Sequence, residues 1–186
     1  CGIGGSDLYM HRMGLIPPGT IMGHEFCGEV TESGHGHKAG DRVCALAPGG
    51  GYAEQAVLPQ GLLIPLPDSW SYGKGAAVPE VWLTAYANLC HEGAMRAGET
   101  VLVHAGASGV GTAAIQIGRE LDTRIVVTAG SDKKLARCRE LGAVLAINYQ
   151  RDDFAAAVMT FTDNQGVDLI LDCVGGPYLE KNIAIL

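Results

Sequence analysis

The chain has 186 residues, of which 47% are hydrophobic and 18% charged, a composition typical of a globular protein with core enough for one domain or two small ones. Its formal net charge of -7 comes without the clustered positive charge that nucleic acids and anionic membranes attract, so we expect small-molecule partners and no nucleic acid. No apolar run reaches the ~20 residues of a membrane span, and we expect a cytoplasmic protein without a membrane contact.

Six cysteines lie far apart and form no C-x-x-C pair, namely Cys1, Cys27, Cys44, Cys90, Cys138 and Cys173. This spacing favours reduced thiols over a disulfide framework or a structural zinc site. The sequence opens without an initiator methionine, and an apolar helical stripe still runs through its last residues. We therefore expect a piece of a longer protein, truncated at both ends.

Glycine and proline interrupt the first part of the chain, up to about residue 70. The pieces between these breaks are strand-sized, at residues 27–33, 41–47 and 53–59. We expect residues 1–70 to form one mostly β domain.

From about residue 71 an expected helix at residues 82–89 is followed by alternating strand-sized and helix-sized segments. The expected strands are residues 101–105, 124–129, 144–149 and 167–174, and the expected helices are residues 110–121, 131–142 and 152–161. Such alternation predicts βαβ units, with helices on the faces of a parallel sheet. The expected fold class is therefore α/β, with a second domain at residues 71–186.

A glycine-rich loop joins the first strand of this α/β region to its first helix. The loop residues are Ala105, Gly106, Ala107, Ser108, Gly109, Val110 and Gly111. Small residues let the backbone approach a ligand, and the N-terminal amides of the helix favour a pyrophosphate. We expect a dinucleotide cradle, although such a loop also serves merely to pack a helix on a strand.

The end of the next strand indicates which dinucleotide the loop would hold. An NAD site usually places Asp or Glu there to bind the ribose 2'-hydroxyl, whereas residues 129–131 are Ala, Gly and Ser. Lys133 and Lys134 follow, with charges that suit a 2'-phosphate. We expect NADPH, but Asp132 keeps NADH open, and a solvated helical turn would also explain the lysines.

Several motifs together resemble the medium-chain dehydrogenase/reductase superfamily, namely GHEFCGEV, GGGYAEQAVLP, VPEVWLTAY, GETVLVHAGASGVGTAAIQIGREL and VDLILDCVGGPYLEKN. The resemblance covers nearly the whole chain and is strongest to the zinc-free quinone oxidoreductase branch, which is related to zeta-crystallin. It implies a GroES-like catalytic domain at residues 1–70 and a Rossmann-type NADP(H)-binding domain at residues 71–186. It also implies a homodimer or homotetramer for the full-length protein.

The resemblance further implies a set of cofactor contacts. These are Gly106, Ser108, Gly109 and Gly111, with Ala107 and Val110 between them, on the pyrophosphate; Ser131 and Lys134 on the 2'-phosphate; Tyr149 near the adenosine phosphate; Cys173, Val174 and Gly175 beside the adenine ribose and nicotinamide; and Thr84 near the nicotinamide ring. Two of these residues have structural alternatives. Tyr149 would also fit as a half-exposed aromatic, and Thr84 as a helix hydroxyl bonded to backbone.

The opening CGIGGSD resembles the zinc-dependent alcohol and polyol dehydrogenases instead. If zinc is present, that resemblance implies His24, Glu25 and Glu80 as its ligands. The cysteine ligand of those enzymes stands two residues before the serine, and this chain has Gly4 there. Cys1 would need a rearranged loop to replace it, so we expect no zinc, and then His24 would be a structural imidazole.

Without zinc the first domain offers no convincing acid–base pair, which fits quinone reduction because a quinone is already electrophilic. Tyr52, Tyr9 and Ser6 are the candidates for contacting the acceptor or donating a proton, although Tyr52 would equally serve as strand packing. The expected function is NADPH-dependent reduction of quinones, or of activated alkenes such as enones, by hydride transfer without zinc. Two alternatives stay open: a zinc-dependent alcohol or polyol dehydrogenase, and a non-enzymatic nucleotide-binding structural protein.

Overall fold

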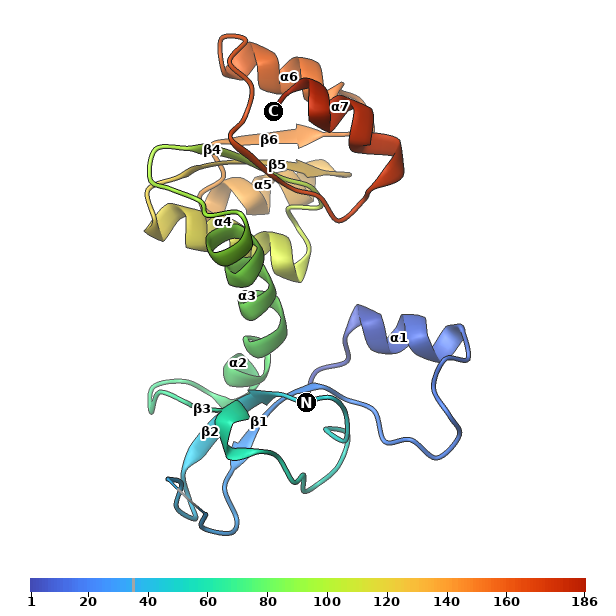
Figure 1. Ribbon diagram of the computed structural model, residues 1–186, viewed down its shortest axis with the longest axis vertical. Helices are drawn as coiled ribbons and strands as arrows, with labels where there is room; N and C mark the ends of the chain where they lie inside the picture. The colour runs from blue at the N-terminus through green and yellow to red at the C-terminus, as the bar shows by residue number, and fades with distance from the viewer. Residues whose placement is uncertain (35) are drawn as a thin grey trace. The chain divides into compact units, whose positions relative to one another are not determined.

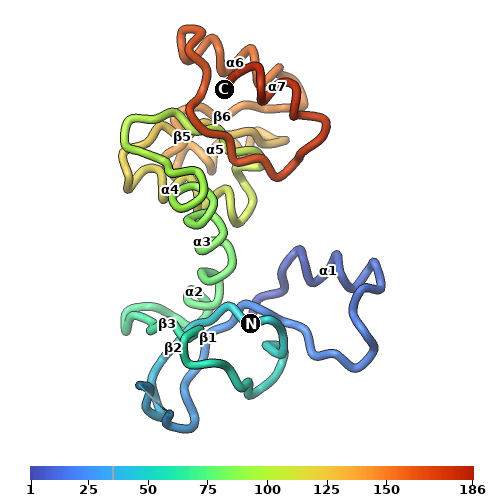
Figure 2. The backbone as a smooth tube through the Cα atoms, viewed as in Figure 1, coloured from blue at the N-terminus to red at the C-terminus, as the bar shows by residue number. Residues whose placement is uncertain are grey.

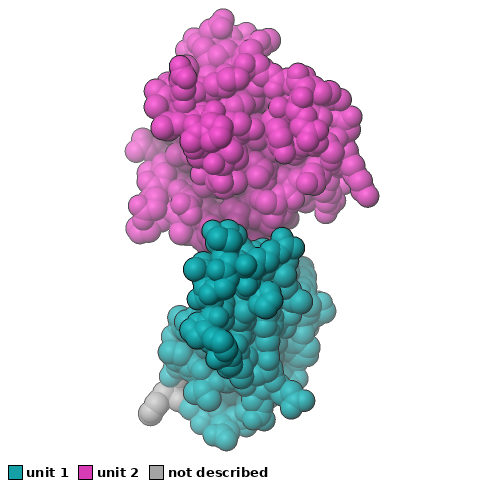
Figure 3. All heavy atoms as spheres, turned by 90° about the vertical axis from the view of Figure 1, so that its right-hand side faces the viewer, with its two compact units in different colours: residues 1–80 teal, residues 81–186 magenta. Residues whose placement is uncertain are grey.

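The computed structural model describes residues 1–34 and 36–186. It divides the chain into two compact units, which Figure 3 draws in different colours. Unit 1 is Cys1–Glu80 and unit 2 is Val81–Leu186, so the division falls within the helix α3, Pro79–Tyr86. Each unit has its own sheet.

Unit 1 contains a three-stranded antiparallel sheet in the order β1-β2-β3. Its elements are α1 (Gly5–Arg12), β1 (Glu25–Glu29), β2 (Arg42–Leu46), the short 3-10 helix η1 (Gln60–Leu62), β3 (Leu63–Pro65) and α2 (Tyr72–Ala76) (Figure 1). The central strand β2 supplies the buried Val43, Cys44 and Ala45. Helix α2 packs tightly on the sheet, because a β-carbon at Gly75 would lie 2.7 Å from the Cys27 sulfur.

The prediction of a strand at residues 53–59 is wrong, since no strand is formed there. A groove of about 430 Å³ is lined on one side by β1 and on the other by residues 53–58. The groove keeps this segment from the hydrogen-bonding edge of β1, so no ladder forms between them. The other two strands were predicted close to their places, at β1 and β2.

Unit 2 contains a four-stranded parallel sheet in the order β6-β5-β4-β7. Its strands are β4 (Thr100–Val103), β5 (Arg124–Ala129), β6 (Leu145–Asn148) and β7 (Leu169–Leu171). Its helical segments after α3 are the π-helical η2 (Ala87–Glu92), α4 (Gly109–Glu120), α5 (Asp132–Leu141), α6 (Phe154–Phe161), the 3-10 helix η3 (Gly176–Tyr178) and α7 (Leu179–Ala184). The predicted α/β fold with a Rossmann-type sheet is confirmed.

Alternating side chains along β4 divide the apolar core of unit 2 between the two faces of its sheet. Val101 and Val103 face one cluster, which is completed by α4 and α5. Leu102 faces the other, to which α6 contributes Phe154 and Val158. The strands are therefore buried on both sides, as their unbroken apolar runs require (Figure 1).

The strand order creates a topological switch point beside β4. The chain builds β5 and β6, which Figure 2 labels, outward on one side of β4. It then returns to place β7 on the other side of β4. The loops that follow β4 and β7 therefore leave the same edge of the sheet in opposite directions. Open α/β sheets bind their ligands in the crevice that forms there.

Across residues 1–34 and 36–186, no helix has both the length and the apolar character needed to cross a membrane.

Candidate functional site

The N-terminus of α4 lies at this switch point and presents free amides. Ser108 is the N-cap, and its hydroxyl oxygen accepts a 3.0 Å hydrogen bond from the Gly111 amide. The Thr112 amide donates to the Ser108 carbonyl. Among the residues that the structure describes, the amides of Gly109 and Val110 have no acceptor. These two donors, at the positive end of a twelve-residue helix, suit a phosphate group.

Close packing explains the glycines of this loop. A β-carbon at Gly111 would lie 2.6 Å from backbone atoms of Ala105 and Gly106, and one at Gly106 would lie 2.4 Å from the Val127 side chain. The partly buried Ala107 packs against the core. Packing therefore explains why these residues are small, while the amides of Gly109 and Val110 are left free for a ligand, so the two sequence interpretations of the loop are compatible.

The loop after β5 offers a hydroxyl and two cations. Ser131 stands at the N-cap of α5, but its side chain makes no capping hydrogen bond. Lys133 and Lys134 are exposed. Asp132, which would favour NADH, is paired with Arg151 at 3.0 Å, so its charge is partly offset. This region thus fits a 2'-phosphate.

Tyr149 lies against the end of β5. A β-carbon at Gly130 would be 2.7 Å from the Tyr149 hydroxyl oxygen, so the ring covers that glycine while 46% of the residue stays exposed. Thr84 is partly buried on α3, and its hydroxyl has no hydrogen-bond partner in the described part of the chain. Its interpretation as a backbone-bonded hydroxyl therefore lacks support.

The loop after β7 is shaped by one carboxylate. Asp172 accepts hydrogen bonds from the amides of Val174 at 2.8 Å and Gly175 at 3.0 Å. Burial alone would raise the pKa of Asp172, but the amides of Gly175 and Val174 and the nearby His104 hold it below its usual range. The Cys173 thiol lies 3.6 Å from the His104 carbonyl oxygen, which links this loop to the one after β4.

Unit 1 holds a second candidate site, a cavity of about 290 Å³ that we call the His24 pocket. Its apolar lining includes Met10, Ile16, Ile21 and Met22, and its polar side chains are Ser6, Asp7, Thr20, His24 and Glu80. An apolar cavity with a few convergent polar groups is typical of a small-molecule site.

Asp7 organises the polar groups of this pocket, although the residue is only 3% exposed. It receives a backbone hydrogen bond from Gly4 at 2.8 Å, the Tyr52 hydroxyl at 2.8 Å and His24 Nδ1 at 3.1 Å. Burial would raise the pKa of Asp7, but these hydrogen bonds and the His24 ring lower it below its usual range. The carboxylate therefore stays charged and fixes a hydrogen on His24 Nδ1.

The other ring nitrogen of His24 faces the exposed groups of the pocket. His24 Nε2 lies 3.4 Å from the Ser6 hydroxyl oxygen and 3.8 Å from a Glu80 carboxylate oxygen. Ser6, His24 and Asp7 thus form a serine–histidine–aspartate chain, in which the aspartate orients the imidazole. Such a chain can hold and move a proton at the serine oxygen.

Sequence reasoning missed Asp7. The sequence does place this acidic residue directly after the candidate Ser6, in the opening segment that resembles the zinc-dependent dehydrogenases. The contacts that define its role come from residues 17 and 45 positions away, which the sequence pattern does not pair.

The two predicted tyrosines lie differently. The Tyr52 hydroxyl is committed to Asp7, and burial together with this hydrogen bond raises the pKa of Tyr52 to about 12. Tyr52 therefore keeps its proton and anchors the carboxylate. Tyr9 is 59% exposed on α1 and does not line the His24 pocket.

The conditional zinc ligands do not converge on one point. The Glu25 carboxylate accepts a hydrogen bond from the Glu80 amide at 3.0 Å, and burial raises the pKa of Glu25. A β-carbon at Gly4 would lie 3.2 Å from His24 Cε1, whereas the Cys1 sulfur lies against other glycines. Outside the undescribed residue 35, no three His, Cys, Asp or Glu side chains are placed to hold a metal ion. The donor set present does not fit a catalytic zinc.

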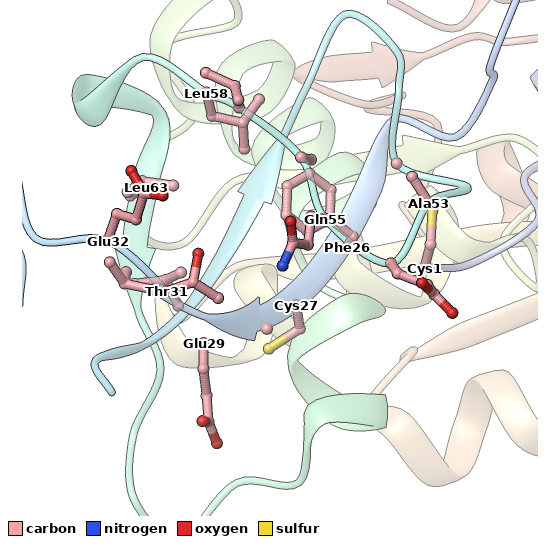
Figure 4. Close-up of a pocket in the computed structure, with 17 residues that line it drawn as sticks. Cys1, Phe26, Cys27, Glu29, Thr31, Glu32, Ala53, Gln55, Leu58 and Leu63 are labelled. Atoms are coloured by element: carbon pink, nitrogen blue, oxygen red, sulfur yellow. The ribbon is translucent and has the colours of Figure 1, made fainter. Parts of the chain in front are cut away.

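The groove along β1 holds different chemistry (Figure 4). Phe26, Cys27 and Glu29 line it from β1, and Gln55 and Leu58 line it from the opposite segment. None of the predicted site residues contributes to its lining. The two candidate sites are therefore the α4 terminus of unit 2 and the His24 pocket of unit 1.

Two family descriptions match these two units. The family described as alcohol dehydrogenase GroES-like domain matches residues 1–68, and the family described as zinc-binding dehydrogenase matches residues 109–186. A GroES-like domain followed by a Rossmann-type sheet defines a class of two-domain dehydrogenases and reductases. The chain belongs to the medium-chain dehydrogenase/reductase superfamily.

Its relatives include quinone and enoyl reductases. Human quinone oxidoreductase is 30% identical over 195 residues, covering 100% of this chain and 59% of that protein. The structure of Escherichia coli quinone oxidoreductase complexed with NADPH has a TM-score of 0.90 at 30% identity, covering 100% of this chain and 59% of its own. CurK enoyl reductase has a TM-score of 0.85 at 30% identity, covering 97% of this chain and 55% of its own. The chain spans little more than half the length of these relatives.

Proposed function

We propose that the protein is an NADPH-dependent oxidoreductase that transfers hydride to a quinone, or to an activated alkene, without zinc. The observation that carries this proposal is the pair of unbonded amides at the N-terminus of α4, at the switch point of a Rossmann-type sheet. A solved relative with the same fold is complexed with NADPH. We propose that this chain binds the same cofactor.

The chain's own groups divide the binding of NADPH between them. The amides of Gly109 and Val110 would bind the pyrophosphate, and Ser131 with Lys134 would bind the 2'-phosphate. When bound, NADPH supplies the hydride. The remaining contacts are proposed as the resemblance implies them: Tyr149 near the adenosine phosphate, Thr84 near the nicotinamide ring, and Cys173, Val174 and Gly175 beside the adenine ribose and nicotinamide.

The His24 pocket is proposed to take the acceptor. Its apolar lining suits a flat conjugated ring or enone, and its polar groups lie together at Ser6 and His24. Hydride reaching carbon leaves a negative charge on the conjugated oxygen, and one proton must arrive there. The Ser6 hydroxyl would donate that proton and be reprotonated by His24 Nε2, which in turn takes a proton from water, while Asp7 keeps the imidazole oriented.

This assignment needs no metal. Of the groups that would hold zinc, the Glu25 carboxylate accepts the Glu80 backbone amide and His24 Nδ1 is bonded to Asp7, and position 4 offers no thiolate. An alcohol dehydrogenase would require a Lewis acid to stabilise its alkoxide, whereas a quinone or enone is already electrophilic. The zinc-dependent alternative thus has less support from this donor set.

The test is the rate of NADPH oxidation by an ortho-quinone, measured on protein extensively treated with chelator. We expect turnover that survives chelation. Turnover that appears only with added zinc and an alcohol or ketone would establish the dehydrogenase alternative. Tight NADPH binding without oxidation by any quinone or enone would establish the structural-protein alternative.

Conjugated enones form the second acceptor class, and the likeness to an enoyl reductase favours them. Parallel assays with an α,β-unsaturated thioester and an ortho-quinone would separate the two. Saturation of the carbon–carbon bond of an enone requires a delivered proton, so turnover of the thioester should depend more strongly on His24 than turnover of the quinone.

A further inference from the structure

A chain of hydrogen-bonded polar groups, Thr128, His104, Asn182 and Asp172, crosses unit 2, and its first three members are buried. His104 is 1% exposed, and its ring lies 4.9 Å from that of Phe154 and 4.8 Å from that of Tyr178, measured between centroids. Its Nδ1 lies 3.0 Å from the Thr128 hydroxyl oxygen, and its Nε2 lies 2.9 Å from the Asn182 amide oxygen.

The direction of every hydrogen bond in this chain is determined by its last member. Asn182 Nδ2 donates to the Asp172 carboxylate at 3.0 Å, so the Asn182 oxygen is the atom turned toward His104. That oxygen can only accept, which places the ring hydrogen on Nε2. Nδ1 is then an acceptor and receives the Thr128 hydroxyl. Burial lowers the pKa of His104, which keeps the ring neutral.

The chain of groups spans the topological switch point. His104 directly follows β4, and Asp172 directly follows β7, its neighbour in the sheet. The His104 amide also donates to the Leu171 carbonyl at 3.0 Å. Asn182 comes from α7 and reaches both loops at once. One amide side chain therefore joins the loop that follows β4 to the loop that follows β7.

The carboxylate oxygen of Asp172 that does not bond Asn182 sets the shape of the loop after β7. This oxygen accepts the amides of Val174 and Gly175, which closes a turn immediately after β7. Ligand crevices of open α/β sheets lie between such loops. A side chain that holds Asp172 also holds the wall of that crevice.

We propose that Asn182 is a positioning residue for the nicotinamide-bearing half of NADPH: through His104 and Asp172 it fixes the loop at residues 172–175 beside the start of the loop that follows β4. The inference rests on the proposed function for the identity of the ligand. His104, Thr128 and Asn182 are buried, and the removal of one member of such a network leaves its buried partners unpaired. Loss of the Asn182 amide frees the loop, while Ser131, Lys134 and the α4 amides are untouched.

The test separates the two halves of the cofactor. Dissociation constants for NADPH and for adenosine 2',5'-bisphosphate, which lacks the nicotinamide half, are measured on the wild-type chain and on Asn182→Leu. We expect Asn182→Leu to weaken NADPH at least about tenfold and the bisphosphate less than about twofold. Ile183→Ala, at an exposed position of the same helix, is the matched control and should change neither constant.

Equal loss of both ligands would overturn the proposal, because it would mean general destabilisation of unit 2. No loss of either would overturn it as well. If Asn182→Leu does not fold, Asn182→Ser takes its place under the same criteria, since serine is too short to reach both His104 and Asp172. A wild-type chain that binds neither NADPH nor the bisphosphate would instead contradict the proposed function.

A second readout tests the coupling itself without any ligand. Asp172→Asn still presents an oxygen to the loop amides but turns a donor toward Asn182, so the Asn182 amide must flip. Its nitrogen would then donate to His104 Nε2, and the ring hydrogen would move to Nδ1. The nitrogen chemical shifts of His104 report this tautomer directly, and an unchanged tautomer in Asp172→Asn would show that Asp172 and His104 are not coupled through Asn182.

Discussion

His24 in unit 1 and His104 in unit 2 each hold an imidazole between two polar partners, but the partners differ in kind. His24 has a charged carboxylate on one side and faces a pocket on the other, with 18% of its side chain exposed. His104 has a neutral hydroxyl and a neutral amide, and the residue is 1% exposed. The first ring keeps a nitrogen available at a cavity, whereas the second has both nitrogens committed.

This difference indicates the role of each histidine. An imidazole with a carboxylate at its back can take a positive charge and pass a proton, as Ser6 requires. An imidazole enclosed by two aromatic rings and neutral partners holds its surroundings in one arrangement instead. Substitutions at His24 should therefore reduce turnover, and substitutions at His104 should reduce stability.

The largest expected effect is at His104. His104→Ala leaves a cavity between two rings and removes the partners of Thr128 and Asn182, so we expect a loss of about 3 kcal/mol in the free energy of unfolding of unit 2. Urea unfolding followed by fluorescence would measure it. His91→Ala, at an exposed position of the same unit, is the control and should stay within about 0.5 kcal/mol. If His104→Ala also lost less than about 0.5 kcal/mol, His104 would have no stabilising role that distinguishes it from His24.

The second effect is on turnover. His24→Asn removes the group that exchanges a proton with Ser6, and we expect kcat for an enone to fall about 10- to 100-fold with little change in the unfolding midpoint. Steady-state assays with saturating NADPH measure it, and His11→Asn on the exposed part of α1 is the matched variant. A smaller fall is expected for a quinone, whose reduced anion takes its proton readily from water. Equal rates in wild type and His24→Asn would remove the proposed proton path.

The sheet of unit 2 could be predicted from the sequence because each of its strands and helices is specified by consecutive residues. Each strand is a short apolar run, each helix begins at a recognisable residue, and their alternation dictates a parallel sheet. The α4 terminus was predictable for the same reason, since the loop residues 105–111 are contiguous. The strand predicted at residues 53–59 failed because pairing depends on what lies beside β1, which no local pattern contains.

The polar networks could not be predicted because their members lie far apart in the chain. Asn182 is 78 positions from His104, and Tyr52 is 45 positions from Asp7. His24 was recognised only as a metal ligand or a structural imidazole, and Asp7 was not recognised at all. The sequence shows which side chains exist, but only the fold shows that one carboxylate receives three donors.

The third prediction concerns which dinucleotide unit 2 prefers. Lys134→Ala should weaken NADPH about tenfold and leave NADH nearly unchanged, because only NADPH carries the 2'-phosphate that an exposed ammonium would bind. Fluorescence titration of both dinucleotides measures the ratio. Lys133→Ala is the control for a general loss of positive charge. Equal weakening of the two dinucleotides by Lys134→Ala would assign the lysine to a solvated helical turn.

The smallest effect concerns a carboxylate outside both networks, Asp153, which caps α6. It accepts hydrogen bonds from the amides of Ala155 and Ala156, and Lys181 lies 2.7 Å away. Lys181 first, and then these amides, lower the pKa of Asp153 below its usual value. Its stabilising contribution is therefore fully present above that usual value and is lost as the pH falls through the lower pKa of the folded state.

Asp153→Ala should cost about 1 kcal/mol at neutral pH through the lost cap, and this difference should shrink below about pH 4 as the wild-type carboxylate is protonated. Thermal unfolding at a series of pH values measures it, with the exposed neighbour in Asp152→Ala as control. Neither variant should alter kcat, because Asp153 caps α6, which covers the face of the unit 2 sheet opposite to α4. A constant difference across the whole pH range would mean that the charge of Asp153 does not contribute, and that the protonated side chain caps α6 as well as the charged one.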